Sequence, residues 1–323
     1  MELGERERVV VVLVRARNPG NIGAVARAMH DFGFSRLRVV NEFAMPFEAA
    51  KSAVDAAAVM ANAAIFASVA EAVADCTLVL GTTAVGERDL RHELLTLAEA
   101  APRVKAELGR KPMVDEDAGD EDAVDEDAGG PLRPTQGKLR APAIQATHIS
   151  EARCGAANFG GDRGRVALLF GSEKTGLSND ELSHCNWLLT VPMQEYAGVR
   201  HPSMNLGQAA AVCLYELVRE GEGPTSRHRD AGHPAQDSAD DVTSGTADGL
   251  AGPATAGQLE RIAALLEEVM EKTEYTRRHA HNCGPAHVRR LVRRIGVDAL
   301  DAPVWMGILR QILWKIGSTS RRP

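Results

Sequence analysis

Residues 168–178 read Leu-Leu-Phe-Gly-Ser-Glu-Lys-Thr-Gly-Leu-Ser, and residues 18–27 read Asn-Pro-Gly-Asn-Ile-Gly-Ala-Val-Ala-Arg. Each stretch places polar residues and glycines at the end of an aliphatic run typical of a buried strand. A third stretch, His-Pro-Ser-Met-Asn-Leu at residues 201–206, follows another such run. Because α/β proteins build ligand sites where their strands end, these stretches predict one composite site.

Aliphatic runs alternate with helical patterns along much of the chain. The runs predict strands over residues 9–14, 37–40, 77–80, 166–170 and 187–191. Apolar residues at helical spacing predict helices over 21–33, 49–59, 61–73, 94–108 and 203–218, with a short helix after Ser178. This alternation predicts an α/β fold with a mainly parallel sheet that helices cover.

Composition divides the chain into three parts. We expect a first domain over residues 1–220, interrupted by an acidic, proline-containing insertion at 113–163 that we expect to be disordered. Residues 221–257 are rich in Gly, Pro, Ser, Thr and Asp and predict a linker. Residues 258–323 predict a small α-helical module, with amphipathic helices at 259–270, 287–295 and 304–316.

The formal net charge of −7 conceals a basic C-terminal end. Residues 115–127 hold nine of the acids, whereas residues 277–323 hold ten Lys and Arg against two Asp. Arg289, Arg290, Arg293 and Arg294 predict one cationic stripe on a helix. The stripe fits tRNA phosphates, and a solvated or dimer-facing helix face remains the alternative.

Several features favour a cytoplasmic protein without a membrane anchor. The sequence holds no run of 18 apolar residues, and its charged N-terminus lacks the apolar core of a signal peptide. Its five cysteines are far apart, which argues against disulfides or a zinc site. His279, His281 and His287 lack accompanying carboxylate or cysteine ligands, so we expect no metal site.

Three motifs resemble those of a known family. Asn21 with Arg27, Gly171-x-Glu173 with Gly176, and Ser203-x-Asn205 follow the order of the motifs in SpoU/TrmH-type SPOUT RNA methyltransferases. The fuller strings around them resemble most the TrmJ branch, which methylates a ribose 2′-hydroxyl of cytidine or uridine in a tRNA anticodon loop. The resemblance covers residues 9–109 and 164–220, and 258–316 more weakly.

The resemblance implies a fold, a cofactor and partners. It implies a SPOUT domain with a C-terminal trefoil knot, S-adenosylmethionine as methyl donor, tRNA as substrate, and a homodimer whose site crosses the two-fold interface. The implied catalytic residues are Asn21, Arg27, Glu173, Ser203 and Asn205. The implied donor-binding residues are Gly81, Thr82, Thr83, Gly171, Gly176, Val191, Pro192, Met193, Ser203 and Leu206.

Elementary chemistry constrains the part that Arg27 can play. A guanidinium has a pKa above about 12 and is a poor proton acceptor in water. We therefore expect Arg27 to bind phosphate and to orient the ribose hydroxyl electrostatically. An exposed helix arginine with no such duty is the alternative.

The other motif residues also allow structural interpretations. Asn21 is expected either to contact substrate or to cap its helix, and Ser203 and Asn205 also suit helix N-caps. Glu173 shapes the site or is an ordinary surface glutamate. The family pattern has Ala where this sequence has Gly207. Glycine at this position weakens a helix by up to about 1 kcal/mol relative to alanine.

Two other functions remain open. The same chemistry on ribosomal RNA differs only in substrate, and a non-catalytic RNA-binding protein would retain the fold without the reaction. A nucleotide-dependent dehydrogenase is disfavoured, because no Gly-x-Gly-x-x-Gly follows the run at 9–14.

Overall fold

The computed structural model describes residues 1–41, 56–83, 92–110, 164–194, 204–219, 252–279, 281 and 283–319. The predicted insertion at 113–163 lies wholly outside these ranges. Residues 221–251 of the predicted linker lie outside them as well. The strands are β1 (Val9–Val14), β2 (Arg36–Val40), β3 (Ala64–Phe66), β4 (Cys76–Thr82), β5 (Leu94–Thr96), β6 (Arg165–Phe170) and β7 (Trp187–Thr190).

Helices alternate with these strands and continue beyond them. Those of the sheet-bearing part are α1 (Leu3–Arg6), α2 (Pro19–Asp31), α3 (Ala57–Ala61), α4 (Val69–Ala72), α5 (Leu97–Gly109), α6 (Asn179–Leu182) and α7 (Leu206–Val218). The C-terminal helices are α8 (Ala256–Lys272), α9 (Tyr275–Arg278), α10 (Pro285–Ile295) and α11 (Asp301–Thr319).

The seven strands of the described ranges form one sheet in the order β3-β2-β1-β6-β4-β7-β5. Each neighbouring pair runs parallel, which confirms the predicted α/β fold. The central strand β1 lies between β2 and β6 and is buried along its whole length. A parallel sheet is covered by helices on both faces, which is why its central strand β1 is aliphatic along its whole length.

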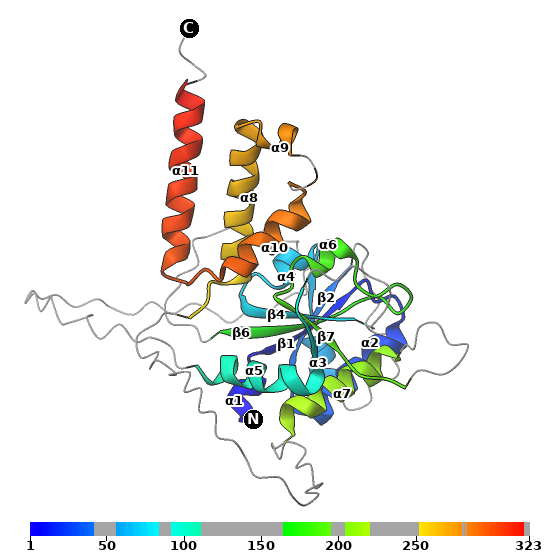
Figure 1. Cartoon of the computed structure of the whole chain (residues 1–323). Helices are drawn as coiled ribbons and strands as arrows, with labels where there is room; N and C mark the ends of the chain where they lie inside the picture. Colours follow the sequence, from blue (N-terminus) through cyan, green and yellow to red (C-terminus); the bar gives the residue numbers. More distant parts are fainter. Residues whose placement is uncertain are drawn as a thin grey trace, which may run out of the picture. The chain divides into compact units, whose positions relative to one another are not determined.

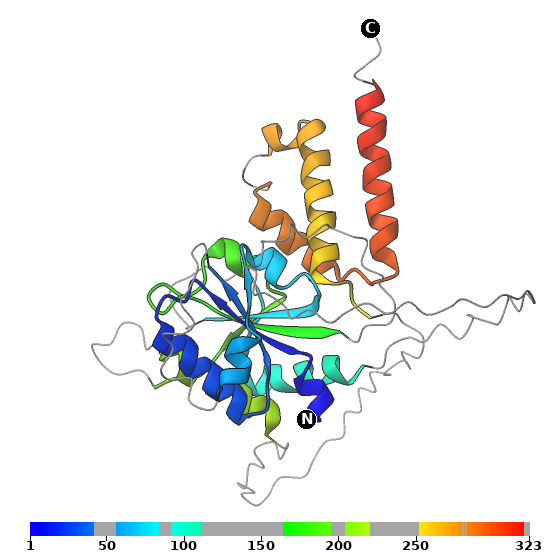
Figure 2. The same cartoon turned by 180° about the vertical axis from the view of Figure 1, so that it is seen from behind.

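Side chains of β1 alternate between two apolar cores, because successive residues of a strand point to opposite faces. Val9, Val11 and Leu13 share one core with residues of α2, α5 and α7. Val10, Val12 and Val14 share the other with residues of α4 and α6. Figure 1 shows α2, α5 and α7 on one side of the sheet and α4 and α6 on the other, and Figure 2 shows the same layers from behind.

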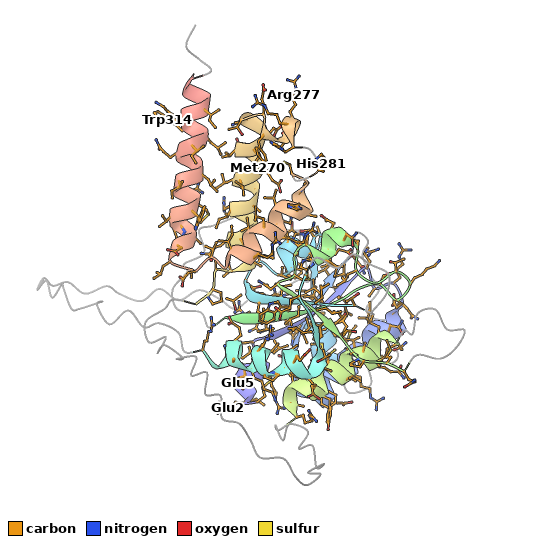
Figure 3. The ribbon with its side chains drawn as sticks, in the orientation of Figure 1. Glu2, Glu5, Met270, Arg277, His281 and Trp314 are labelled. Carbon is orange, nitrogen blue, oxygen red and sulfur yellow. The ribbon has the colours of Figure 1, made fainter. Side chains whose placement is uncertain are left out.

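The C-terminal helices bury a core of their own, which α8, α10 and α11 share. Ala254 belongs to this core and is 1% exposed, so the core of the C-terminal helices includes a residue of the predicted linker. Met270 on α8 packs partly buried against the core, whereas Trp314 on α11 is 64% exposed (Figure 3). Of the helices in the described ranges, none has the length and apolar composition needed to cross a bilayer.

Two predicted helices contain strands. The predicted helix at 61–73 is wrong: β3 occupies Ala64–Phe66, pairs with β2, and is followed by α4. Ser68 starts α4, since its hydroxyl accepts from the amide of Glu71 at 3.2 Å. The predicted helix at 94–108 begins instead with β5, and Thr96 then caps α5 in a capping box with Glu99. Pairing at the sheet edge outweighs the helix propensity of these short segments.

Helix starts are shifted at three other places. Helix α2 begins at Pro19 rather than at residue 21, and α7 begins at Leu206 rather than at residue 203. Of the predicted helix at 49–59, residues 49–55 lie outside the described ranges, and α3 begins at Ala57.

Candidate active site at the carboxyl edge of the sheet

Three of the predicted motifs meet at the edge where the strands end, here called the carboxyl edge. Strands β1, β6, β4 and β7 lie next to one another in the sheet and run parallel. The segments that follow them therefore leave the sheet at one edge. These segments are residues 15–18 after β1, 171–178 after β6, Thr83 after β4 and 191–194 after β7.

The turn from β1 into α2 is fixed by Asn18. Its Oδ1 accepts from the amide of Gly20 at 2.9 Å, and Pro19 occupies the first helical turn. The interpretation of Asn21 as a helix cap is therefore wrong, because Asn18 is the cap. Asn-Pro is a recognisable start signal, so the sequence alone held the means to place this cap correctly.

Asn21 connects the other two motifs instead of capping its helix. Its Nδ2 donates to Oε1 of Glu173 at 3.0 Å, and its Oδ1 accepts from Nδ2 of Asn205 at 3.1 Å. Oδ1 of Asn205 accepts from the amide of Gly207 at 2.9 Å, so Asn205 also caps α7, as its alternative interpretation predicted. Glu173, Asn21 and Asn205 thus form one hydrogen-bonded chain, here called the Asn21 chain.

Arg27 does not join the Asn21 chain. It is exposed on α2, six residues after Asn21, which corresponds to about 9 Å along the helix axis. Among the described residues it has neither a hydrogen bond nor an ion pair. Its guanidinium is therefore available to a group from outside the described part of this chain. Ser203 lies outside the described residues.

The loop at residues 171–178 folds tightly back on itself. The amide of Gly176 donates to the carbonyl of Ser172 at 2.9 Å, and Gly176 has a φ of 65°, which favours glycine. A Cβ on Gly171 would lie 2.2 Å from the carbonyl carbon of Gly176. Because Gly171 has no side chain, the backbone of Gly176 can pass close to it, and this folds the loop that carries Glu173.

Arg15 holds the same loop and was not predicted as a site residue. Its Nε and Nη2 donate to Oε1 and Oε2 of Glu181 at 2.7 and 2.9 Å, and Nη2 also donates to the carbonyl of Gly176 at 3.0 Å. Burial by itself raises the pKa of Glu181, but hydrogen bonds from Arg15 and Ser178 outweigh it and lower the pKa. No local sequence pattern signals a pair that joins residues 166 positions apart.

The remaining predicted donor-binding residues line the carboxyl edge or the sheet beneath it. Gly81 is buried in β4, where a Cβ would lie 2.7 Å from Sγ of Cys185. The Thr82 hydroxyl donates to the carbonyl of Leu169 at 2.8 Å, and the amide of Thr83 donates to the carbonyl of Leu189 at 2.9 Å. The last group follows β7 or opens α7: Val191 and Met193 are half-buried, Pro192 is exposed and Leu206 is buried.

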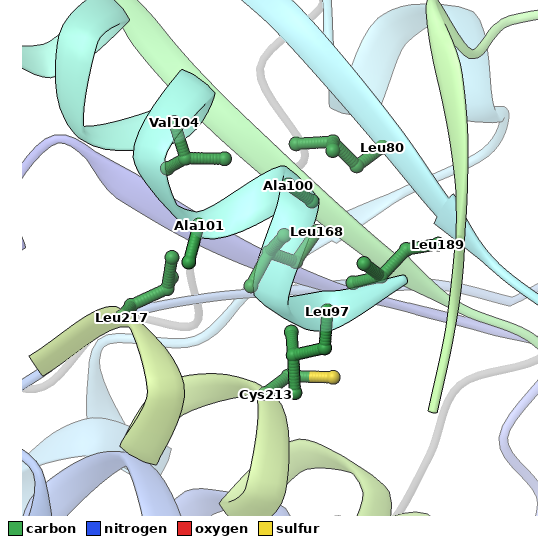
Figure 4. A pocket seen from close by; sticks show the side chains of 9 residues that line it. All are labelled: Leu80, Leu97, Ala100, Ala101, Val104, Leu168, Leu189, Cys213 and Leu217. Atoms are coloured by element: carbon green, nitrogen blue, oxygen red, sulfur yellow. The ribbon is translucent and has the colours of Figure 1, made fainter. Parts of the chain in front are cut away.

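A cavity elsewhere in the core does not belong to this edge (Figure 4). It is lined by Leu80, Leu97, Ala100, Ala101, Val104, Leu168, Leu189, Cys213 and Leu217. Burial raises the pKa of Cys213 to about 12, which keeps the thiol neutral. A pocket with only apolar walls and a neutral thiol offers nothing to orient a polar cofactor.

The predicted cationic stripe on α10 is wrong as a single exposed surface. Arg293 is 8% exposed, and burial lowers its pKa. Arg289 is engaged with two acids, at 2.8 Å from Oε1 of Glu260 and 2.7 Å from Oδ1 of Asp180. Half of the four arginines therefore serve the packing of α10 rather than facing an RNA.

Comparison with known proteins fits this geometry. The model of the SpoU rRNA Methylase family matches residues 8–104 and 134–215, which is more than half of the chain. A protein of Salmonella typhimurium named tRNA (cytidine/uridine-2′-O-)-methyltransferase TrmJ is 28% identical over 316 residues, covering 96% of each chain. The protein of the same name from Yersinia enterocolitica is 26% identical over 320 residues, covering 97% of this chain and 93% of its own.

A solved structure shares the fold. The crystal structure of TrmJ from Z. mobilis ZM4 has a TM-score of 0.61 and 22% identity, covering 94% of this chain and 98% of its own. The family model spans all the motif residues from Asn21 to Asn205. The resemblance drawn from these motifs is confirmed, and the chain belongs to the SpoU rRNA Methylase family.

Proposed function

We propose that this chain transfers a methyl group from S-adenosylmethionine to a ribose 2′-hydroxyl of tRNA. The observation that carries the proposal is the Asn21 chain, in which one residue from each of the three motifs is hydrogen-bonded at the carboxyl edge. Membership of a methylase family and relatives named as tRNA 2′-O-methyltransferases over nearly their full length support the same chemistry.

The residues at the carboxyl edge suit the methyl donor. An adenosyl group needs an apolar wall for its ring and main-chain polar groups for its edges. Val191, Met193 and Leu206 offer the apolar wall, and the glycine-bearing loop at 171–178 offers main chain beside it. We propose that these segments, with Thr83 and Pro192, hold the donor. When bound, S-adenosylmethionine supplies an electrophilic methyl group.

Arg27 acts on the substrate in this proposal. Its exposed guanidinium binds a backbone phosphate through paired N–H donors and orients the neighbouring 2′-hydroxyl. The same positive charge stabilises the negative charge that develops on the hydroxyl oxygen as its proton leaves. Asn21, Glu173 and Asn205 hold the loop and the start of α7 in place around the reacting groups.

We propose a homodimer with a shared site, as the family resemblance implies. Arg27 lies outside the Asn21 chain, about 9 Å along α2 from Asn21, and in this proposal it acts on substrate held by the second copy. Mixing Arg27→Ala with Asn205→Ala tests this, since each mixed dimer then holds one intact site. We expect about a quarter of wild-type activity to return. Activity no higher than that of the separate variants would contradict the shared site.

Three finer points follow the family resemblance. We propose that the segment from β6 to α7 is threaded as a trefoil knot, that the methylated ribose lies in the anticodon loop, and that the protein works in the cytoplasm. The side-chain hydrogen bonds of Asn21 to Glu173 and to Asn205 join segments that such a knot would bring together.

Labelled methyl transfer to bulk RNA tests the proposed function. Wild-type protein is incubated with labelled S-adenosylmethionine and either tRNA or ribosomal RNA, and the RNA is digested to nucleosides. We expect 2′-O-methylated cytidine or uridine from tRNA. Label on ribosomal RNA alone would show that ribosomal RNA, and not tRNA, is the substrate. Failure to bind the donor at all would favour the non-catalytic RNA-binding alternative.

A further inference from the structure

We propose that Arg15 is a positioning residue that sets the loop at 171–178 for binding of the methyl donor. The inference rests on the proposed function, which it deepens by naming a residue that acts through the loop rather than on the reacting groups. Arg15 stands directly after β1, and its side chain crosses to the segment that follows β6.

The contacts of Arg15 hold the end of this segment and the helix that follows it. Its fork of two N–H donors grips both oxygens of Glu181 on α6, at 2.7 and 2.9 Å. The Nη2 atom also donates to the carbonyl of Gly176, which has a φ of 65° and lies at the base of the loop, just before α6. One guanidinium thus ties the base of the loop and the helix after it to the end of the central strand.

The backbone of Arg15 is held in an uncommon conformation to make these contacts. Its φ is 56°, in the left-handed region that non-glycine residues seldom adopt. Such a conformation is unfavourable by itself and persists where surrounding contacts outweigh its cost. Here those contacts include the bond from the Arg15 amide to the carbonyl of Val40 at 2.9 Å, the pair with Glu181 and the bond to Gly176.

The other end of the loop is held by the Asn21 chain. Glu173 lies between Ser172 and Gly176, whose backbones bond to each other at 2.9 Å, and it accepts from Asn21 at 3.0 Å. The loop is therefore fixed at its base by Arg15 and at its turn by Asn21. Releasing the base lets the turn shift, and a shift of about 1 Å at a binding site costs up to about a hundredfold in rate.

The pair contributes more to position than to stability. The side chain of Arg15 is 35% exposed and that of Glu181 is 14% exposed, so solvent screens their attraction. A lysine in place of Arg15 keeps the charge but loses the planar fork that fits a carboxylate. Arg15→Lys is accordingly a change of geometry at nearly constant charge.

Arg38 offers a matched control within the same sheet. Its Nη1 and Nη2 donate to Oδ1 and Oδ2 of Asp75 at 2.5 and 2.7 Å, and Nη1 also donates to the carbonyl of Ala72 at 2.7 Å. Arg38→Lys thus removes the same fork and the same kind of carbonyl contact, away from the loop at 171–178.

The experiment compares the full-length wild type with Arg15→Lys, Arg38→Lys and Glu181→Gln. Glutamine retains the capping box of α6 but loses the charge that Arg15 grips. We expect Arg15→Lys and Glu181→Gln each to raise KM for S-adenosylmethionine about tenfold with kcat changed by less than about threefold. Arg38→Lys should leave both constants within about twofold of wild type.

A second readout does not depend on activity. Hydrogen exchange at the amides of residues 172–177 should accelerate in Arg15→Lys and Glu181→Gln, and not in Arg38→Lys. Unchanged exchange and KM in Arg15→Lys, or equal changes in Arg38→Lys, would overturn the inference. A wild type without methyl transfer would refute the proposed function alone, because the exchange measurement would still decide whether Arg15 positions the loop.

Discussion

Nδ2 of Asn205 donates to Oδ1 of Asn21 at 3.1 Å, joining residues 184 positions apart in the chain. The direction of this bond follows from its neighbours. A carboxylate only accepts, so Asn21 must turn its NH₂ group to Glu173 and its oxygen to Asn205. Asn205 then presents its own oxygen to the amide of Gly207 at the start of α7. One carboxylate thereby orients two amides and a helix end.

Replacing Asn21 should separate activity from stability. Asn21→Ala removes both side-chain bonds. Asn21→Asp keeps an oxygen that can accept from Asn205, but it replaces the donor to Glu173 with a second carboxylate. We expect methyl transfer to fall about ten- to a hundredfold in Asn21→Ala and further in Asn21→Asp, with stability changed by less than about 1 kcal/mol. Steady-state kinetics and urea unfolding measure the two quantities.

Asn18→Ala is the matched control for this pair of variants. It removes the cap of α2 and should cost about 1 kcal/mol of stability, while the Asn21 chain stays intact. A large loss of activity in Asn18→Ala, or none in Asn21→Asp, would contradict the division of labour between these two asparagines.

Gly171 should tolerate no side chain. A Cβ there would lie 2.2 Å from the carbonyl carbon of Gly176 and 2.3 Å from the amide nitrogen of Leu177. Both atoms belong to backbone, so Gly171→Ala must displace the loop. We expect donor affinity to fall at least about tenfold in calorimetric titration. Gly109→Ala, at a glycine with open space around it, should bind the donor like wild type.

Gly207 should prove better suited to α7 than alanine. A Cβ at this position would lie 2.6 Å from Cβ of Ala24 on α2, so Gly207→Ala should destabilise the fold by about 1–3 kcal/mol despite the higher helix propensity of alanine. Urea unfolding of Gly207→Ala, Ala24→Gly and the double variant measures their coupling. Additive effects would show that the two helices do not meet at these residues.

Stability should fall as the pH drops from about 6.5 to about 4. Burial lowers the pKa of His92 to about 4, helped by the charges of Arg290, Arg293 and Arg294. The unfolded chain, with a histidine pKa near 6.5, then binds the proton more readily, and folding weakens as pH falls through this window. Asp75 and Glu260 have pKa values lowered to about 2, so their stabilising contributions are lost only at lower pH.

Thermal unfolding between pH 7 and 4.5 checks this assignment. His92→Gln should flatten the slope relative to wild type, because the variant has no proton to gain at this position. An unchanged slope in His92→Gln would assign the acid sensitivity to other groups.

The sequence predicted the strands of the centre and missed those of the edges. Strand β1 is a run of six aliphatic residues, and β6 has five apolar residues after Arg165, so the sequence pattern identifies both directly. Strands β3 and β5 have three residues each, within alanine-rich or leucine-rich segments of helical character. Their pairing is a property of the assembled sheet, and no local pattern contains it.

The candidate site was predictable to the extent that it lies in contiguous motifs. Asn21, Glu173 and Asn205 are brought together as expected from motifs at strand ends. The sequence did not predict the role of Arg15, because that role depends on Glu181 on α6. It did not predict the need for glycine at position 207, because that need depends on Ala24 of a neighbouring helix. The prediction that Arg289 and Arg293 belong to one exposed cationic stripe was wrong for the same reason, since the pairing of Arg289 and the burial of Arg293 depend on the packed fold.

The most direct test of the central claim is methyl transfer to tRNA by wild type and Arg27→Ala, with donor binding measured in parallel. Arg27 is exposed and has no partner among the described residues, so its removal should spare both folding and donor affinity. We predict label on tRNA at an alkali-resistant linkage for wild type, and at least about a hundredfold less for Arg27→Ala. Transfer at the wild-type rate by Arg27→Ala would contradict the account.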